Sequence, residues 1–208
     1  MNVLEPDEDG ALSPQTADAE FDVVVLATSA GGLVVLRQLL SELPANFSAA
    51  ILVVQHLERH RHSFAAEILD RSTSLFVKEA EAGERLRSAR VYVAPPDHHL
   101  LVNPAGILSL NQSALVNFTR PAADVLFESV AASYGKRAIA VVLTGTGKDG
   151  AAGVRAIKAN GGIVIAQEQP EFSGMPKAAI ETGVVDFVLP LSKVAPALVQ
   201  LVEKESIK

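Results

Sequence analysis

The sequence predicts an α/β fold: a doubly wound, mostly parallel sheet with helices on both faces and an antiparallel hairpin insertion. Two observations predict it. Short, fully apolar runs alternate along the chain with segments whose apolar residues recur at helical spacing. Apolar runs without polar alternation are typical of strands buried on both faces, and such strands form parallel sheets joined by helical crossovers.

Capping and turn residues divide the first half of the chain into elements. Pro44 ends the first helix, and Ser63 is the expected N-cap of the second. The tetrapeptide at 103–106, Asn-Pro-Ala-Gly, predicts a hairpin turn, so the middle of the chain, about residues 75–110, is predicted to be an antiparallel insertion at one edge. The predicted strands are Phe21–Ala27, Ala49–Gln55, Leu75–Lys78, Val91–Ala94, Leu100–Val102 and Ile107–Leu110, and the predicted helices are Gly31–Leu43 and Ser63–Arg71.

The second half continues the alternation. Pro121 suits the first turn of a helix, and the turn Asn-Gly-Gly at 160–162 closes another. The predicted helices are Pro121–Ser133, Gly150–Ala159 and Val194–Lys204, the predicted strands are Ala138–Thr144, Ile163–Ala166 and Phe187–Leu189, and a short segment lies at Lys177–Thr182.

Charge separates the N-terminal segment from the rest of the chain. The net charge is −6, and residues 1–20 hold six acidic residues without any Lys or Arg. We therefore expect a disordered acidic leader at 1–20 and one folded domain at 21–208. The remaining 18 acidic residues balance the 18 basic ones, so no basic field is available for nucleic acid and no nucleic-acid partner is expected.

Composition also excludes several classes of protein. Cysteine is absent, which excludes disulfides, thiol catalysis and cysteine metal sites. No stretch reaches the ~20 apolar residues of a membrane span, and no signal peptide begins the chain. We expect a cytoplasmic protein without membrane insertion.

Three long predicted strands each end at a reactive side chain: Ser29, His56 and, after Ala138–Thr144, Asp149. Ligands of open α/β sheets bind outside the carboxyl ends of the strands. Serine, histidine and aspartate are the nucleophile, the base and the group that orients the base. Each also has a structural interpretation: a β–α turn, a hydrogen-bonded histidine, and an N-cap for the helix that begins at Gly150. At this level the pattern indicates a hydrolase without proving one.

A rival interpretation comes from the same segment. The sequence Gly-Thr-Gly-Lys-Asp-Gly at 145–150 matches G-x-G-x-x-G between a strand and a helix, and Glu168 follows near the expected distance for a ribose-binding acid. This pattern predicts a Rossmann-like nucleotide-binding oxidoreductase. It would leave Ser29 and His56 unexplained. A receptor-binding adaptor without catalysis is a third hypothesis.

Ordered motifs from about Phe21 to the C-terminus resemble the catalytic domain of the CheB family, the bacterial chemotaxis protein-glutamate methylesterases. The motifs are Ala-Thr-Ser-Ala-Gly-Gly at 27–32, Val-Val-Gln-His at 53–56, Arg-Val-Tyr-Val-Ala-Pro-Pro at 90–96, Thr-Arg-Pro-Ala-Ala-Asp-Val at 119–125, Leu-Thr-Gly-Thr-Gly-Lys-Asp-Gly-Ala-Ala-Gly at 143–153 and Gly-Met-Pro at 174–176. Several motifs in the correct order are more specific than any one of them.

The resemblance implies a Ser-His-Asp triad of Ser29, His56 and Asp149 that hydrolyses glutamyl methyl esters on chemoreceptors, with deamidation of certain receptor glutamines as a related activity. It implies no metal and no organic cofactor. Ala30, Thr146 and Gly147 would supply backbone N–H groups to the oxyanion, while Arg120 and Met175 would belong to the substrate cleft. The expected partner is the methylated cytoplasmic helical domain of a chemoreceptor.

The sequence departs from the family pattern at three places. Ala27-Thr28 precedes the serine where Gly-Ala or Gly-Thr is usual, Thr146 stands where Met is frequent, and Ala122-Ala123 replaces Ser-Val. These changes affect the expected substrate preference more than the chemistry. Family members typically carry a receiver domain of ~120 residues before the catalytic domain. Residues 1–20 are too short for one, so a separate regulatory receiver protein is a further expected partner.

The histidines raise the question of a metal site. Three of the five lie at His56, His60 and His62, the last two in a charged segment, and His98 and His99 form a second pair. Because the segment 58–62 is charged and loop-like, we interpret it as solvated surface and expect no metal.

Overall fold

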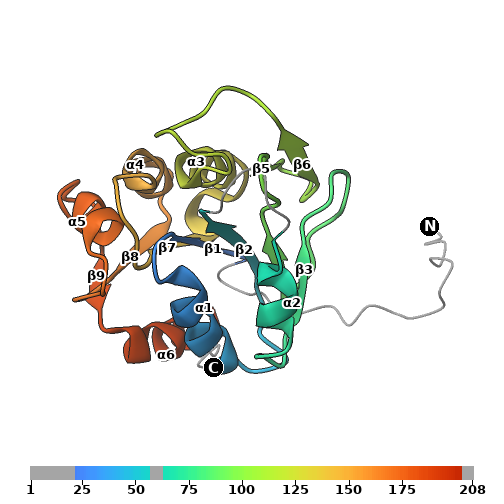
Figure 1. The fold of residues 1–208 in the computed structure, drawn as a ribbon, viewed down its shortest axis with the longest axis horizontal. Coiled ribbons are helices and arrows are strands. Elements are labelled where there is room, and N and C mark those ends of the chain that lie inside the picture. The colour runs from blue at the N-terminus through green and yellow to red at the C-terminus, as the bar shows by residue number, and fades with distance from the viewer. Residues whose placement is uncertain (1–21, 57–62, 203–208) are drawn as a thin grey trace, which may run out of the picture.

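The structure, a computed structural model, describes residues 22–56 and 63–202. Within these ranges one mostly buried sheet of parallel strands organises the fold, and a small separate pair of antiparallel strands lies beside it (Figure 1). The order across the sheet is β3 (Phe76–Glu79), β4 (Arg90–Val93), β2 (Ala50–Gln55), β1 (Val23–Thr28), β7 (Ala138–Val142), β8 (Ile163–Gln167) and β9 (Phe187–Leu189); the separate pair is β5 (His99–Val102) and β6 (Leu108–Asn111). The predicted fold class is confirmed.

Helices cover both faces of the sheet (Figure 1). One face carries α3 (Ala123–Tyr134), α4 (Ala151–Ala159) and α5 (Gly174–Ile180), and the other carries α1 (Gly32–Ser41), α2 (Ala65–Asp70) and α6 (Leu191–Val202). A short 3₁₀ turn at Gly135–Arg137, absent from the sequence prediction, joins α3 to β7.

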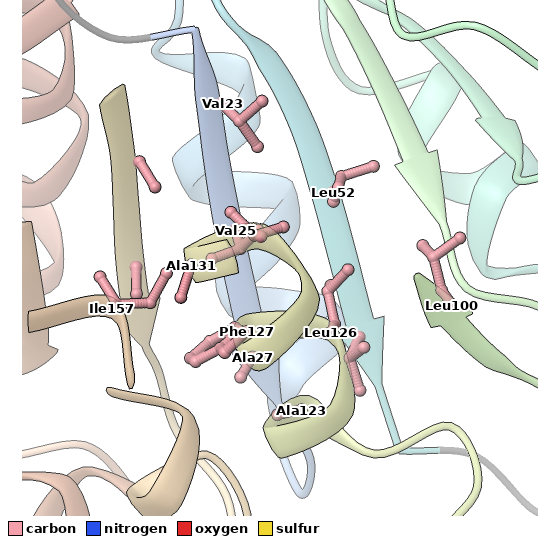
Figure 2. Close-up of a cluster of buried hydrophobic side chains, with 14 of the residues drawn as sticks. Val23, Val25, Ala27, Leu52, Leu100, Ala123, Leu126, Phe127, Ala131 and Ile157 are labelled. Carbon is pink, nitrogen blue, oxygen red and sulfur yellow. The ribbon is translucent and has the colours of Figure 1, made fainter. Parts of the chain in front are cut away.

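The apolar run of β1 explains its central position. Val23, Val25 and Ala27 face one cluster of buried side chains, while Val24 and Leu26 face the other. Figure 2 shows the first of these clusters, where β1 packs against α3. Because successive side chains of a strand point to opposite faces, only a run without polar alternation suits a strand covered on both sides.

The strands are added to the sheet in opposite directions on the two sides of the β1–β7 boundary. The crossovers from β1 lead outward to β2 and β4 on one side, whereas β7, β8 and β9 follow on the other. Such a switch point leaves a crevice outside the carboxyl ends of the two central strands, which is where ligands of open α/β sheets bind.

The predicted antiparallel insertion at 75–110 is wrong in its first part. β3 and β4 are parallel members of the main sheet, and only β5 and β6 form the hairpin. β4 is buried on both faces, with Tyr92 on one side and its two valines on the other, which makes it an inner strand. Tyr92 Oη accepts a hydrogen bond from the Arg87 N–H (3.1 Å), which anchors the connection between the two strands.

Three predicted helix starts are also shifted by two or three residues. α3 begins at Ala123 and not at Pro121, α6 begins at Leu191 and not at Val194, and α2 begins at Ala65 with Phe64 at the N-cap position. Ser63 still serves that end, because its Oγ accepts the Ala65 N–H (3.1 Å). The segment expected at 177–182 is the end of α5, which begins at Gly174.

Some predictions lie outside the described residues. These are the acidic leader at 1–20, the charged segment at 58–62 and the last residues of the C-terminal helix. Within the described ranges, no helix is long and apolar enough to cross a membrane.

Candidate active site

Ser29 lies in the tight turn between β1 and α1. Its N–H donates to Thr144 O (3.0 Å), which extends the pairing of β1 with β7 by one residue, and its carbonyl accepts the N–H of Gly32 (2.9 Å). Gly31 takes φ +73° at the N-cap position, a conformation that favours glycine. The turn therefore holds Ser29 half-buried at the carboxyl end of the central strand.

His56 comes directly after the neighbouring strand, β2. Its N–H donates to Thr28 O (3.0 Å), so its backbone continues the β1–β2 ladder. Gln55 links the two sites, because its Nε2 group donates to Ser29 O (2.9 Å) and to His56 O (3.0 Å). The backbones of the predicted nucleophile and base are thus joined through one buried amide.

Asp149 reaches His56 from the loop after β7. Its Oδ2 lies 2.7 Å from His56 Nε2, and the two side chains are 2% and 11% exposed. Bonded in this way, Nε2 carries the proton and Nδ1 is the ring nitrogen left to act as a base. The structure therefore brings the side chains of His56 and Asp149, which are 93 residues apart along the chain, into direct contact.

Asp149 does not cap its own helix. Gly150 is the N-cap of α4, whereas Asp149 accepts the N–H groups of Ala123 (2.6 Å) and Asp124 (3.1 Å) at the start of α3. Burial alone would raise the pKa of Asp149, but the hydrogen bonds from His56 and from these two backbone N–H groups hold its pKa below the usual value. The carboxylate is therefore kept ionised beside the imidazole.

A second buried carboxylate, Asp124, is linked to Asp149 through Asn117. Its Oδ1 accepts the N–H groups of Gly150 (2.9 Å) and Gly153 (2.8 Å) at the start of α4. Burial raises the pKa of Asp124, and the nearby charge of Asp149 raises it further, against the hydrogen bonds that it accepts. Asn117 contacts both carboxylates through Nδ2, at 2.7 Å from Asp124 Oδ2 and 3.1 Å from Asp149 Oδ1.

The glycine-rich loop at 145–150 passes close to Ser29. A Cβ on Gly145 would lie 2.4 Å from Met175 Sδ and 2.9 Å from Ser29 Cβ, so the chain approaches the serine at a distance that only glycine permits. Met175 is fully buried under this loop, and its N–H donates to Gly145 O (2.9 Å). Its side chain supports the loop from the core.

Three N–H groups predicted to face the oxyanion make no hydrogen bond within the described part of the chain. They belong to Ala30, Thr146 and Gly147. Ala30 is half-buried in the turn after β1, while Thr146 and Gly147 are exposed in the loop after β7. Free N–H groups in these turns are available to a ligand, as a developing oxyanion requires.

Arg120 lies beside the site, and most of its donors are already used. Its guanidinium binds Asp97 Oδ1 through Nε (3.1 Å) and Nη2 (2.7 Å), and Nη1 donates to the carbonyls of Gln112 (2.8 Å) and Ser113 (2.7 Å). In this structure the arginine organises the loop that carries Asn117. A direct contact between Arg120 and a substrate stays a prediction.

The sequence prediction missed three residues of this arrangement: Gln55, Asn117 and Asp124. Asp124 belongs to the motif at 119–125, and Gln55 directly precedes His56. Their position beside predicted site residues could have pointed to both. Asn117 lies in a polar stretch and had no such signal, because its contacts are with residues 7 and 32 positions away.

The described histidines beyond His56 are held by backbone groups. His99 is buried, with Nε2 3.1 Å from Ala114 O and Nδ1 accepting the Ala122 N–H (3.2 Å), and His98 Nδ1 lies 3.0 Å from Pro96 O. No cluster of three potential metal ligands occurs among the residues that the structure describes. His60 and His62 lie outside them.

Comparison with known proteins agrees with this geometry. A family model described as CheB methylesterase matches residues 24–198. The chain is similar to the catalytic domain of the Thermotoga maritima CheB methylesterase, whose crystal structure matches it with a TM-score of 0.84 and 41% identity, over 88% of this chain and 99% of that one.

The curated relatives described below are named as protein-glutamate methylesterases/protein-glutamine glutaminases. A Leptospira interrogans protein, provisionally named a protein-glutamate methylesterase/protein-glutamine glutaminase, is 39% identical over 183 residues, which are 87% of this chain and 95% of the relative. A Pyrococcus abyssi protein-glutamate methylesterase/protein-glutamine glutaminase is 42% identical over 86% of this chain and 50% of its own length. The chain thus spans nearly all of the first relative and half of the second.

Proposed function

Because the chain belongs to the CheB methylesterase family, we propose that Ser29, His56 and Asp149 form the triad with which it hydrolyses glutamyl methyl esters of proteins. The observation that carries this proposal is the 2.7 Å contact between His56 Nε2 and Asp149 Oδ2, at the ends of the two strands that flank β1 and its Ser29. Family membership favours this activity over the oxidoreductase and over the silent adaptor.

The first half-reaction forms an acyl-enzyme. His56 Nδ1 takes the proton of Ser29 Oγ as the oxygen attacks the ester carbonyl. Asp149 holds the imidazole in the required tautomer and stabilises the imidazolium that forms. The N–H groups of Ala30, Thr146 and Gly147 donate to the oxyanion, the carbon–oxygen bond to the methoxy group breaks, and the imidazolium returns its proton so that methanol leaves.

The second half-reaction releases the acid. His56 takes a proton from water, the resulting hydroxide attacks the acyl carbonyl, and Ser29 regains its proton as the ester bond to the enzyme breaks. The product is a glutamyl carboxyl group. A glutamine side chain would follow the same route with ammonia as the leaving group, in line with the glutaminase part of the relatives' names.

The substrate protein that we propose is the methylated cytoplasmic helical domain of a chemoreceptor, and a separate receiver protein is a proposed regulator. The name of the matching family model, CheB methylesterase, supports an ester substrate.

Methanol release from a methylated chemoreceptor domain tests the proposal. The unmodified chain should release methanol, and a serine-reactive phosphonate should label Ser29 covalently. Ser29→Ala should release none and take no label while keeping its circular dichroism and unfolding midpoint. Methanol release by Ser29→Ala at the original rate would sink the triad assignment.

A further inference from the structure

Asn117 connects two buried carboxylates that belong to different helix starts. Its Nδ2 group lies 2.7 Å from Asp124 Oδ2 and 3.1 Å from Asp149 Oδ1. An amide nitrogen has two hydrogens, so both donors of Asn117 are used, one on each carboxylate. We propose that Asn117 is a positioning residue of the triad, which holds Asp149 in line with His56 by bridging it to Asp124. This inference rests on the proposed function.

The carboxylate of Asp149 accepts four hydrogen bonds, two on each oxygen. Its Oδ2 accepts from His56 (2.7 Å) and from the Ala123 N–H (2.6 Å), and its Oδ1 accepts from the Asp124 N–H (3.1 Å) and from Asn117. A carboxylate has about four lone-pair sites, so every site is used. Asn117 is the one side chain on Oδ1 among the described residues, and without it that oxygen keeps a single donor.

The charges of Asp124 and Asp149 also act on each other. Asp124 and Asp149 are 6% and 2% exposed, and like charges that close repel each other strongly away from water. The amide group of Asn117 places one partly positive N–H against each of the two carboxylates. Losing the amide removes a donor from each carboxylate and leaves their repulsion in place, which pushes Asp149 out of line with the imidazole. A misplacement of about 1 Å in such a constellation costs on the order of 10²-fold in rate.

The backbone that carries the amide has a left-handed conformation that suits asparagine. Asn117 and Phe118 form the tip of a tight turn with φ +51° and +65°, closed by hydrogen bonds between Val116 and Thr119 in both directions (3.2 and 2.9 Å). Asparagine tolerates this left-handed region, whereas a bulky residue there is uncommon. Phe118 is 93% exposed, so the turn presents one side chain to the triad acid and the next to solvent.

This turn supplies a matched pair of variants. Asn117→Gly and Phe118→Gly make the same substitution at adjacent positions that both have positive φ, and glycine is unstrained at each. Only the first removes the bridging amide. Both variants would be assayed with the methylated receptor domain and with the serine-reactive phosphonate, with rates normalised to folded protein.

Asn117→Gly should lower kcat by about 10²-fold with KM within about twofold, since the amide contacts the triad acid and not the substrate. Labelling of Ser29 should slow by a similar factor, and the low-field proton resonance of the His56–Asp149 hydrogen bond should shift or vanish. Phe118→Gly should leave kcat, labelling and that resonance unchanged.

Two outcomes would overturn the inference: equal rates in the two variants, or an unaltered low-field resonance in Asn117→Gly. Either would make Asn117 a residue of loop structure alone. The proposed function fails separately, when Ser29→Ala keeps its methanol release, so the two failures are distinguishable.

Discussion

Asp149 and Asp124 cap each other's helices. Asp149, just before α4, accepts the first N–H groups of α3, while Asp124, in the first turn of α3, accepts N–H groups at the start of α4. Carboxylates at helix N-termini satisfy free donors and meet the positive end of the helix dipole. The exchange ties the orientation of Asp149, the proposed triad acid, to the packing of two helices, which gives the site a rigid support.

Replacing Asp149, the proposed triad acid, should strongly reduce the rate of ester hydrolysis. We expect Asp149→Asn to lower kcat by roughly 10⁴-fold, since an amide beside His56 favours the wrong imidazole tautomer. Methanol release and phosphonate labelling would measure it. Glu168→Gln is the control: Glu168 is exposed after β8 and is the acid that dinucleotide binding would need. An active Asp149→Asn variant, or an inactive Glu168→Gln variant, would contradict the assignment.

Stability should fall in acid through Asp149. Its pKa is lower in the folded chain than the ordinary value of 3.8, so the unfolded chain binds its proton more readily. The stabilisation is present above about pH 4 and is lost as the pH falls through the folded pKa. Urea unfolding at several pH values from 6 to 3 would measure how steeply the free energy of unfolding falls with pH. This fall should be smaller in Asp149→Asn than in the unmodified chain.

Asp124 should act in the opposite direction in the same experiment. Its pKa is raised in the folded chain, so its ionisation opposes folding as the pH rises from about 4 through the folded pKa. A variant Asp124→Asn should therefore make the acid loss of stability steeper than in the unmodified chain. An unchanged slope in both variants would show that these two carboxylates do not govern the acid transition.

The cap on α4 should contribute measurable stability. We expect Asp124→Ala to lower the free energy of unfolding by about 1–3 kcal/mol, because the N–H groups of Gly150 and Gly153 are left buried without an acceptor. Glu128→Ala, on the exposed side of the same helix, should change it by less than about 0.5 kcal/mol. Similar losses in the two variants would argue against the cap.

The close approach of Gly145 should be essential for activity. A methyl group there would meet Met175 Sδ and Ser29 Cβ inside contact distance, so Gly145→Ala should move Ser29 and lower kcat by at least about 10²-fold. Gly183→Ala serves as the control, because its added Cβ meets no atom within 4 Å although its φ is +76°. Equal activity in the two variants, per folded molecule, would contradict the prediction.

Most of the fold could be predicted from local pattern. The apolar runs of β1, β2 and β7 mark strands buried on both faces, and their ends at Ser29 and His56 and before Asp149 could be placed at one edge of the sheet. The parallel pairing of β3 with β4 could not, because a short strand followed by a loop is compatible with either direction. That choice depends on which neighbours bury Tyr92 and the two valines of β4.

The sequence by itself predicted most of the strands and placed the three side chains of the proposed triad at strand ends, because apolar periodicity and glycine turns act over a few residues. The tertiary structure decided how Asp149 is held. Its partners Ala123, Asp124 and Asn117 lie 25 to 32 residues earlier in the chain, and His56 lies 93 residues earlier. Hydrogen bonds between groups so far apart in sequence depend on how α3 and α4 pack over the sheet. That packing could not be predicted from a local sequence pattern.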